Sequence, residues 1–248
     1  GMTDALTENF PAKAALISNA KQVFCMWDYR PKKLYYDGLW NKWKSQSKFL
    51  DLITLSSKEQ IQWWQDEFRT KVIYLPHGCV MQESQYDDNF RRECVFIGAR
   101  NNVYPYNERV KLINAIAEKI NLTWLDAGGG DDSPERAQMW QDMAKYYHSS
   151  ISVLDISHFW DVEGYASGRY FYSAGLGGCS ITRRFLGCDE LYPEGVKLYF
   201  TTVDEAIQKI NLCLKNPEYV KQIKEKAKEW TKKYHNYKIR FQELLKNV

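Results

Sequence analysis

The chain has 248 residues, of which 44% are hydrophobic and 26% are charged. This composition excludes an intrinsically disordered chain, and the length allows two modest α/β domains, each with its own core. The formal net charge of +3 is too small to attract nucleic acid at long range, and no apolar stretch has the length of a membrane span, so we expect a cytoplasmic protein.

The N-terminal region of the chain alternates helical and β-prone segments. The expected elements are a helix at 12–20, strands at 22–27, 50–55 and 71–75, and a helix from 57 to about 68. Ser57 and Gln60 have the spacing of a capping box, which predicts the start of the second helix. The segment 29–48 mixes Pro, Gly and Trp with lysines and is expected to be mostly loop, and the polar stretch 82–92 is the expected linker.

From residue 94 onward, short apolar strands alternate with helices. Strands are expected at 94–97, 122–125, 151–154, 178–181 and 196–200. Between them, Ile113, Ile116 and Ile120 form one helical stripe, and Thr202 with Glu205 forms a second capping box. Because the strands are apolar on both faces, they predict a parallel sheet covered by helices on both sides. We expect a partial N-terminal α/β domain at 1–90 and a Rossmann-like domain at 91–248, whose last helix can pack back on the N-terminal domain.

Ligands of such sheets bind beyond the carboxyl ends of the strands, and three loops of this chain occupy that position. The first loop, Gly98-Ala99-Arg100, combines a backbone that permits close approach with a positive charge shortly before a helix. Arg100 and the free amides at the start of that helix suit a diphosphate. The alternative is a plain turn between strand and helix with a solvated arginine.

The second loop contains Gly128, Gly129 and Gly130, whose backbone freedom suits close contact with a base or a ribose. No Lys-Ser or Lys-Thr pair follows, which excludes a Walker loop, and a flexible connector is the alternative. Asp131 and Asp132 have no third ligand at a suitable spacing, so we expect a solvated pair at a helix start.

The third loop leads into the stretch 161–178, where a family resemblance becomes specific. Arg169, Phe171, Ala174 and Gly177 match the pattern R-x-F-E-A-x-A-x-G, in which the arginine begins a helix. Further matches lie at 144–151, 191–195 and 234–240. From about residue 50 to the C-terminus, the chain resembles group 1 glycosyltransferases of the GT-B fold, particularly the branch related to spore-maturation glycosyltransferases.

The resemblance implies a nucleotide-sugar donor site. In that family, Gly98 and Arg100 would contact the donor diphosphate from one side, and Arg169 with the Gly168 amide would contact it from the other. Two arginines and helix-start amides would stabilise the charge of a departing nucleoside diphosphate, so such enzymes generally need no metal. The donor-site candidates are Gly98, Ala99, Arg100, Asp126, Gly128, Gly129, Tyr147, Glu163, Ser167, Gly168, Arg169, Tyr170 and Tyr172.

The chain departs from the family pattern at the residue that binds the donor ribose. Tyr172 stands where the family has a glutamate, and it can donate a hydrogen bond but carries no charge. Glu163, in the preceding loop, is the expected substitute.

The acceptor site of the resembled family lies in the first domain. Asp28, at the end of an expected strand, is the candidate base, because a carboxylate can take a proton from an acceptor hydroxyl. The alternative for Asp28 is a structural hydrogen bond. Trp40 and Trp43 could stack on an acceptor sugar, and burial is their alternative.

Metal sites and other cofactors are not expected. The four histidines have no zinc spacing, and the six cysteines form no C-x-x-C pair and are expected to be buried free thiols. The expected function is therefore the transfer of a sugar from a UDP- or GDP-linked donor to a glycan, lipid or protein acceptor. The alternatives are an inactive nucleotide-sugar-binding or partner protein, and a phage DNA-modifying glycosyltransferase. A partner chain or a homo-oligomer could complete the N-terminal domain.

Overall fold

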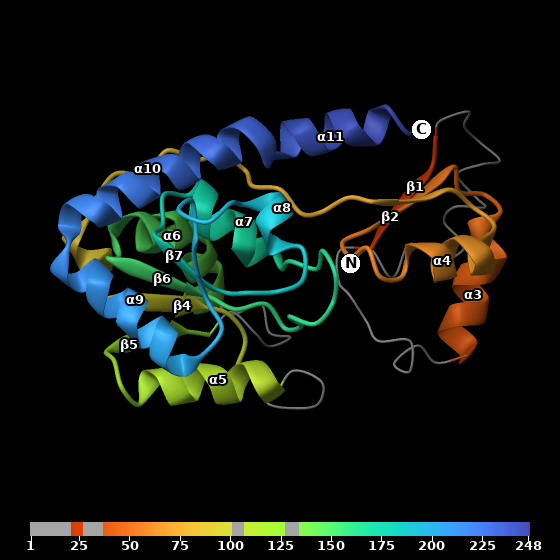
Figure 1. The fold of residues 1–248 in the computed structure, drawn as a ribbon. Coiled ribbons are helices and arrows are strands. Elements are labelled where there is room, and N and C mark those ends of the chain that lie inside the picture. Colours follow the sequence, from red (N-terminus) through yellow and green to blue (C-terminus); the bar gives the residue numbers. More distant parts are fainter. Residues whose placement is uncertain (1–20, 27–36, 101–106, 127–133) are drawn as a thin grey trace.

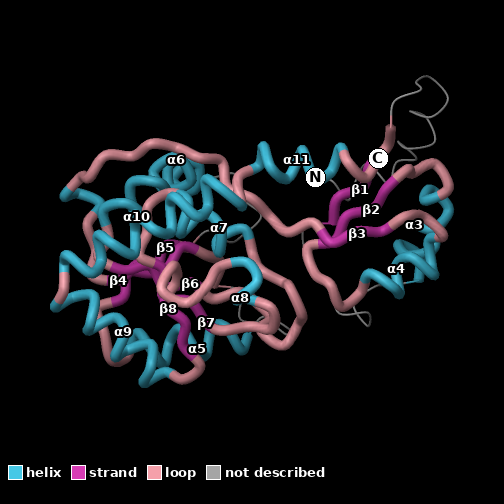
Figure 2. Tube along the Cα trace, turned by 45° about the horizontal axis from the view of Figure 1, so that its top comes forward, coloured by secondary structure: helices cyan, strands magenta, loops and turns pink. Residues whose placement is uncertain are grey.

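The computed structural model describes residues 21–26, 37–100, 107–126 and 134–248. These residues form two parallel sheets with helices packed on them, as Figure 1 shows. In the tube view of Figure 2, the two sheets are separate groups of strands, and the long helices surround the larger sheet.

The N-terminal sheet has the strand order β1-β2-β3, with all pairs parallel. Its strands are β1 (Val23–Met26), β2 (Leu52–Leu55) and β3 (Val72–Tyr74), and its helices are α3 (Asp37–Ser47) and α4 (Ile61–Phe68). Trp43 and Trp64 are fully buried beside Phe24, and Trp40 stacks on Trp63 with the ring centroids 4.5 Å apart. The burial alternative is therefore correct for Trp43, because its ring fills the core of this sheet.

Two expectations for this region of the chain are wrong. Much of the segment 29–48 is helical, because α3 buries Trp43 and Ser47, one turn apart, against the rest of the sheet. The first capping box does not form either. Helix α4 begins at Ile61, and the side chain of Gln60 accepts a hydrogen bond from Trp64 Nε1 at 3.4 Å instead of capping an amide.

The C-terminal sheet has the order β5-β4-β6-β7-β8 and is parallel throughout. Its strands are β4 (Cys94–Ile97), β5 (Leu122–Leu125), β6 (Ser152–Asp155), β7 (Ser180–Arg183) and β8 (Leu198–Phe200). Strand β7 begins two residues later than expected, because Gly177 at φ +84° belongs to the turn that ends the preceding helix.

Helices cover both faces of this sheet. They are α5 (Asn107–Ala117), α6 (Pro134–Ser149), α7 (Gly168–Gly175), α8 (Cys188–Leu191), α9 (Val203–Lys215) and α10 (Pro217–Tyr234). Residues of α6 and α7 share one hydrophobic core, residues of α5 and α9 share the other, and α10 contributes to both. The expected capping box of Thr202 and Glu205 is present at the start of α9. All six cysteines are free thiols, and five of them are buried.

The chain returns to the N-terminal sheet at its end. Helix α11 (Tyr237–Leu245) continues beyond α10 toward β1 and β2, as both ribbon and tube views show. Arg240 Nε donates to His77 O at 3.1 Å, and Lys71 Nζ donates to Asn247 O at 2.9 Å. The last residues therefore connect the two sheets. No helix among the described residues has the length and apolarity needed to cross a membrane.

Candidate functional site

The strand order defines one crevice at the carboxyl ends of the C-terminal sheet. The chain passes from β4 outward to β5 and then returns to the other side of β4 to form β6. The connections after β4 and β6 therefore diverge to opposite faces. Such a switch point is where doubly wound sheets bind their ligands.

Arg169, in the first turn of α7, lies across this crevice. Its Nε donates to Ile97 O at 2.5 Å, at the end of β4, and its Nη1 donates to Ile156 O at 3.0 Å, just after β6. The guanidinium carbon lies 4.6 Å from the centre of the Phe96 ring. A Cβ atom at Gly98 would collide with Arg169 Nη2, so the arginine can occupy this position only because residue 98 is a glycine.

Arg109, in the first turn of α5, approaches the same place and was not among the residues expected from the sequence. Its Nη2 donates to Ala99 O at 2.6 Å, and its guanidinium carbon lies 5.7 Å from the Phe96 ring centre. The side chain is 1% exposed, and its Nε atom is buried without a hydrogen-bond partner. Burial, with a further contribution from Arg169, lowers the pKa of Arg109 to about 9. In the sequence, Arg109 could have been found from its position four residues before Ile113, which places it on the buried stripe of α5.

Within the part of the chain that the structure describes, these two guanidinium groups have no carboxylate partner. Among the residues that the structure describes, neither Arg109 nor Arg169 forms an ion pair, and the acceptors of both are backbone carbonyls. A buried cation without a counter-ion is costly, so the crevice is an electrostatically incomplete site that favours an anion.

The same positive charge acts on two neighbouring residues. Burial, followed by the charges of Arg109 and Arg169, lowers the pKa of His158 to about 3. Burial raises the pKa of Tyr147, on α6, and the charge of Arg169 opposes that rise. Both effects place His158 and Tyr147 within electrostatic range of the crevice.

Arg100 lies on the β5 side of the crevice and is exposed. Its amide donates to Asp126 Oδ1 at 3.2 Å, and its Nη2 donates to Trp124 O at 3.0 Å. Its guanidinium carbon is 4.9 Å from the Trp124 ring centre, and Trp124 Nε1 donates to Gly98 O at 2.8 Å. Arg100 and Arg169 thus flank the turn at Gly98 from opposite sides, toward β5 and β6 respectively.

The two tyrosine candidates of α7 point away from the crevice. The Tyr170 side chain is fully buried, with its hydroxyl 2.6 Å from that of Tyr199 and donating to Cys188 O at 3.2 Å. The Tyr172 hydroxyl lies 3.2 Å from that of Tyr237 on α11. Tyr170 is therefore a core residue, and Tyr172 contacts the C-terminal helix.

The loop before α7 contacts the N-terminal sheet. Glu163 is exposed, and its Oε1 lies 3.7 Å from Lys58 Nζ, while its carbonyl accepts from the Lys58 amide at 2.9 Å. Ser167 is the N-cap residue of α7 and makes no side-chain cap, and Gly168 is the first helical residue. Three of the candidates, Asp28, Gly128 and Gly129, lie outside the described residues.

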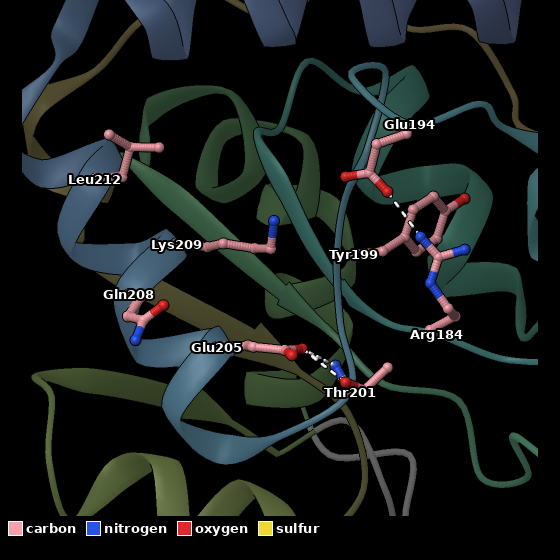
Figure 3. A pocket seen from close by; sticks show the side chains of 8 residues that line it. All are labelled: Arg184, Glu194, Tyr199, Thr201, Glu205, Gln208, Lys209 and Leu212. Atoms are coloured by element: carbon pink, nitrogen blue, oxygen red, sulfur yellow. Dashed lines mark hydrogen bonds and ion pairs between the residues drawn. The ribbon is translucent and has the colours of Figure 1, made fainter.

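A separate hollow of about 610 Å³ lies beside β8 and α9 (Figure 3). Its charged groups are mostly satisfied within the chain: Arg184 Nη2 is 2.8 Å from Glu194 Oε2, and Glu205 Oε2 accepts from Thr201 Oγ1 at 2.7 Å. None of the three arginines of the switch point lines this hollow. In the described ranges of the chain, no three His, Cys, Asp or Glu side chains are grouped so that they could hold a metal ion.

One protein family matches most of the sheet that carries this crevice. The model of a family described as glycosyl transferase-like matches residues 105–246, more than half of the chain. No curated protein sequence matches.

Several solved glycosyltransferase structures share the fold. Sucrose-phosphate synthase from Thermosynechococcus elongatus is 12% identical with a TM-score of 0.62, and the match covers 96% of this chain and 70% of that one. Anabaena HepE in complex with UDP and glucose is 15% identical with a TM-score of 0.62, over 99% of this chain and 76% of that one. TarM is 10% identical with a TM-score of 0.59, over 93% of this chain and 50% of that one. The chain belongs to the glycosyl transferase-like family and has the α/β architecture of the GT-B fold.

Proposed function

We propose that this glycosyltransferase transfers a sugar from a nucleoside diphosphate donor to an acceptor, and that Arg169 and Arg109 bind the diphosphate. The observation that carries the proposal is the convergence of the buried Arg109 and the half-buried Arg169 at the switch point, where the acceptors of both guanidinium groups among the described residues are backbone carbonyls. A diphosphate would supply the missing negative charge. Its oxygens could accept from Arg169 Nη2 and from the amides at the start of α7.

The guanidinium groups of Arg169 and Arg109 would also stabilise the leaving diphosphate during sugar transfer. Negative charge develops on the leaving diphosphate as its bond to the sugar breaks. Guanidinium groups that are already held in place, at Ile97 O and Ala99 O, stabilise that charge without reorganising. Arg100, stacked on Trp124, would approach the donor from the β5 side.

In this proposal the donor binds to the domain at 91–248 and the acceptor to the domain at 1–90. Two observations support this assignment of donor and acceptor to the two domains. The crevice lies on the C-terminal sheet, and the contact of Lys58 with Glu163 places the N-terminal domain beside the loop that leads into α7. The complexes of HepE with UDP and with UDP-glucose support a uridine diphosphate donor, and a GDP-linked donor is the alternative. Asp28 is retained as the proposed base.

Arg169→Ala tests the donor site. We expect the Kd for UDP, measured by isothermal titration calorimetry, to rise between about tenfold and a hundredfold, since a hydrogen bond to a charged group contributes about 1.5–3 kcal/mol. Arg169→Lys should recover only some of the affinity, because an ammonium group cannot reproduce the two-pronged contact with Ile97 O and Ile156 O.

Arg184→Ala is the matched control. Arg184 also lies over an aromatic ring, with its guanidinium carbon 4.7 Å from the centre of Tyr199, but its charge is compensated by Asp189 and Glu194. UDP affinity should be unchanged in this variant. Equal affinities of the wild type and a folded Arg169→Ala variant for both UDP and GDP would refute the donor site.

A second candidate is a protein that binds the donor without turning it over. It is favoured by Tyr172, which replaces the acidic residue of the resembled family and directs its hydroxyl to Tyr237. Slow hydrolysis of UDP-glucose by the purified chain, abolished by Arg169→Ala, would exclude it. Tight UDP binding with no release of glucose would support it.

A further inference from the structure

A second hollow, of about 730 Å³, lies between the N-terminal sheet and the helices α8, α10 and α11. Residues of the N-terminal sheet and of these helices contribute to its lining. Those that carry the argument are Lys58, Glu190, Trp230, Tyr234, Arg240 and Glu243. None of the arginines of the switch point is among its lining residues. We call it the interdomain hollow.

Its charges cancel. Lys58 Nζ forms a close ion pair with Glu190, and Arg240 Nη1 lies 2.9 Å from Glu243 Oε2. The ring of His235, which also lines the hollow, is neutral near pH 7 because burial and the charge of Arg240 lower its pKa to about 4. A charged ligand would have to break one of these pairs, whereas a neutral polar ligand would not.

The two carboxylates remain accessible to such a ligand. The side chains of Glu190 and Glu243 are 61% and 44% exposed, so their oxygens can accept further hydrogen bonds while they hold their cations. Neutral ligands with several hydroxyl groups suit carboxylates of this kind.

An aromatic pair supplies the apolar side of the hollow. The rings of Trp230 and Tyr234, one turn apart on α10, have centroids 4.5 Å apart and are inclined at 50°. Trp230 Nε1 donates to Leu191 O at 2.9 Å, which holds the indole in place, and Tyr234 is 38% exposed. A sugar ring has the matching shape, since one face consists of C–H groups that pack on aromatic rings and its rim consists of hydroxyls.

We propose that the interdomain hollow binds a neutral mono- or disaccharide, at a site separate from the diphosphate crevice. Tyr234 and Trp230 pack against the sugar face, and Glu190 and Glu243 accept from its hydroxyls. Because Lys58 of the N-terminal domain also lines the hollow, beside Glu190 of α8, a bound sugar lies between the two halves of the molecule.

Saturation-transfer NMR of the full chain with glucose, maltose and cellobiose, in the presence of excess UDP, tests the proposal. The UDP occupies the proposed diphosphate site, and any saccharide signal that comes from the interdomain hollow is identified by its loss in a Tyr234→Ala variant. We expect signal transfer to at least one of the three sugars, with affinity about tenfold weaker in Tyr234→Ala and nearly unchanged in Tyr234→Phe, which keeps the ring. Glu243→Gln should weaken binding less, because the amide oxygen still accepts a hydrogen bond.

Phe241→Ala is the matched control. Phe241 is 61% exposed on the neighbouring helix α11 and does not line the hollow, so its removal should leave binding unchanged. The proposal is overturned if none of the three sugars binds to the wild type, or if Tyr234→Ala binds as the wild type does. Both results are independent of whether the chain binds UDP, which is measured separately on the Arg169→Ala variant.

Discussion

His235 shows how one side chain can make the stability of this protein depend on pH. Its Nδ1 lies 2.6 Å from Arg240 Nη2, and its Nε2 lies 2.6 Å from Leu191 O. An arginine can only donate and a carbonyl can only accept, so the imidazole is neutral and carries its proton on Nε2. Burial and the charge of Arg240 accordingly lower its pKa from 6.5 to about 4.

A lowered histidine pKa predicts loss of stability in mild acid. The unfolded chain takes up a proton near pH 6.5 and the folded chain only near pH 4, so the stabilisation is complete above pH 6.5 and is lost as the pH falls toward 4. For His235 alone, the free energy of unfolding should decrease by roughly 3 kcal/mol over that interval. Urea unfolding at a series of pH values measures this decrease.

His235→Gln is the comparison for that experiment. The variant should be less stable at pH 7, because the pairing with Arg240 and Leu191 is disturbed, and its stability should depend less steeply on pH between 6.5 and 4. The half-buried His158, whose pKa is lowered to about 3, keeps some of the dependence in both proteins. Identical slopes for the two proteins would show that His235 is not protonated on unfolding.

Helix α7 is attached to the sheet by a buried ionic network. Lys197 Nζ lies 2.9 Å from Asp155 Oδ2 and donates to Ser173 Oγ at 3.1 Å, and both charged side chains are fully buried. Ser180 Oγ donates to Ser173 Oγ at 2.8 Å. Ser173 lies one turn after Arg169, so the network connects the helix that carries the donor arginine to β6 and β7.

Replacing only one residue of the buried Lys197–Asp155 ion pair should lower the free energy of unfolding much more than replacing both residues. Asp155→Asn leaves Lys197 buried without its counter-ion, and we expect the free energy of unfolding to fall by about 3–5 kcal/mol. The double variant Asp155→Leu with Lys197→Met should recover most of that loss, because no buried charge remains. Chemical denaturation of Asp155→Leu, Lys197→Met and the double variant measures the coupling. Additive effects of the two single changes would contradict a direct interaction.

The whole molecule consists of two sheets connected by the linker and by the returning C-terminal segment. Cys79 pairs with this segment, accepting from Tyr237 at 3.2 Å and donating to His235 at 2.9 Å through main-chain atoms. Arg240, 4% exposed, donates to His77 O. The connection thus depends on backbone and buried groups and less on exposed ion pairs, which contribute little.

Removal of residues 237–248 should therefore loosen the N-terminal sheet selectively. The shortened chain loses the contacts of Arg240 with His77 and of Asn247 with Lys71. Hydrogen exchange measured by mass spectrometry should show faster exchange in β2, β3 and residues 76–80, with the protection of β4, β6 and β7 preserved. Glu243→Gln, which keeps the helix, is the control, and unchanged protection of β2 and β3 in the shortened chain would contradict the assigned role of α11.

Local patterns in the sequence were sufficient for the architecture of the C-terminal sheet. Apolar strands alternating with amphipathic helices predicted a covered parallel sheet, which the structure and the fold comparisons confirm, and the Thr202–Glu205 capping box marked the start of α9 correctly. Such signals depend on residues within one or two turns of one another, so a single chain can reveal them. Helix α3 was missed because its proline- and lysine-rich surroundings conceal the buried positions of Trp43 and Ser47.

The composition of the candidate site required the tertiary structure. The sequence by itself determined that the apolar run 94–97 stops at Gly98, and the resemblance to a known family implied a helix start at Arg169, one residue after the Gly168 at which α7 begins. Only the strand order brings β4 beside β6 and places Arg169 across their ends, with Arg109 converging on the same ring of Phe96. That convergence joins residues 60 positions apart along the chain, and it depends on packing energies between elements, which no local pattern of residues contains.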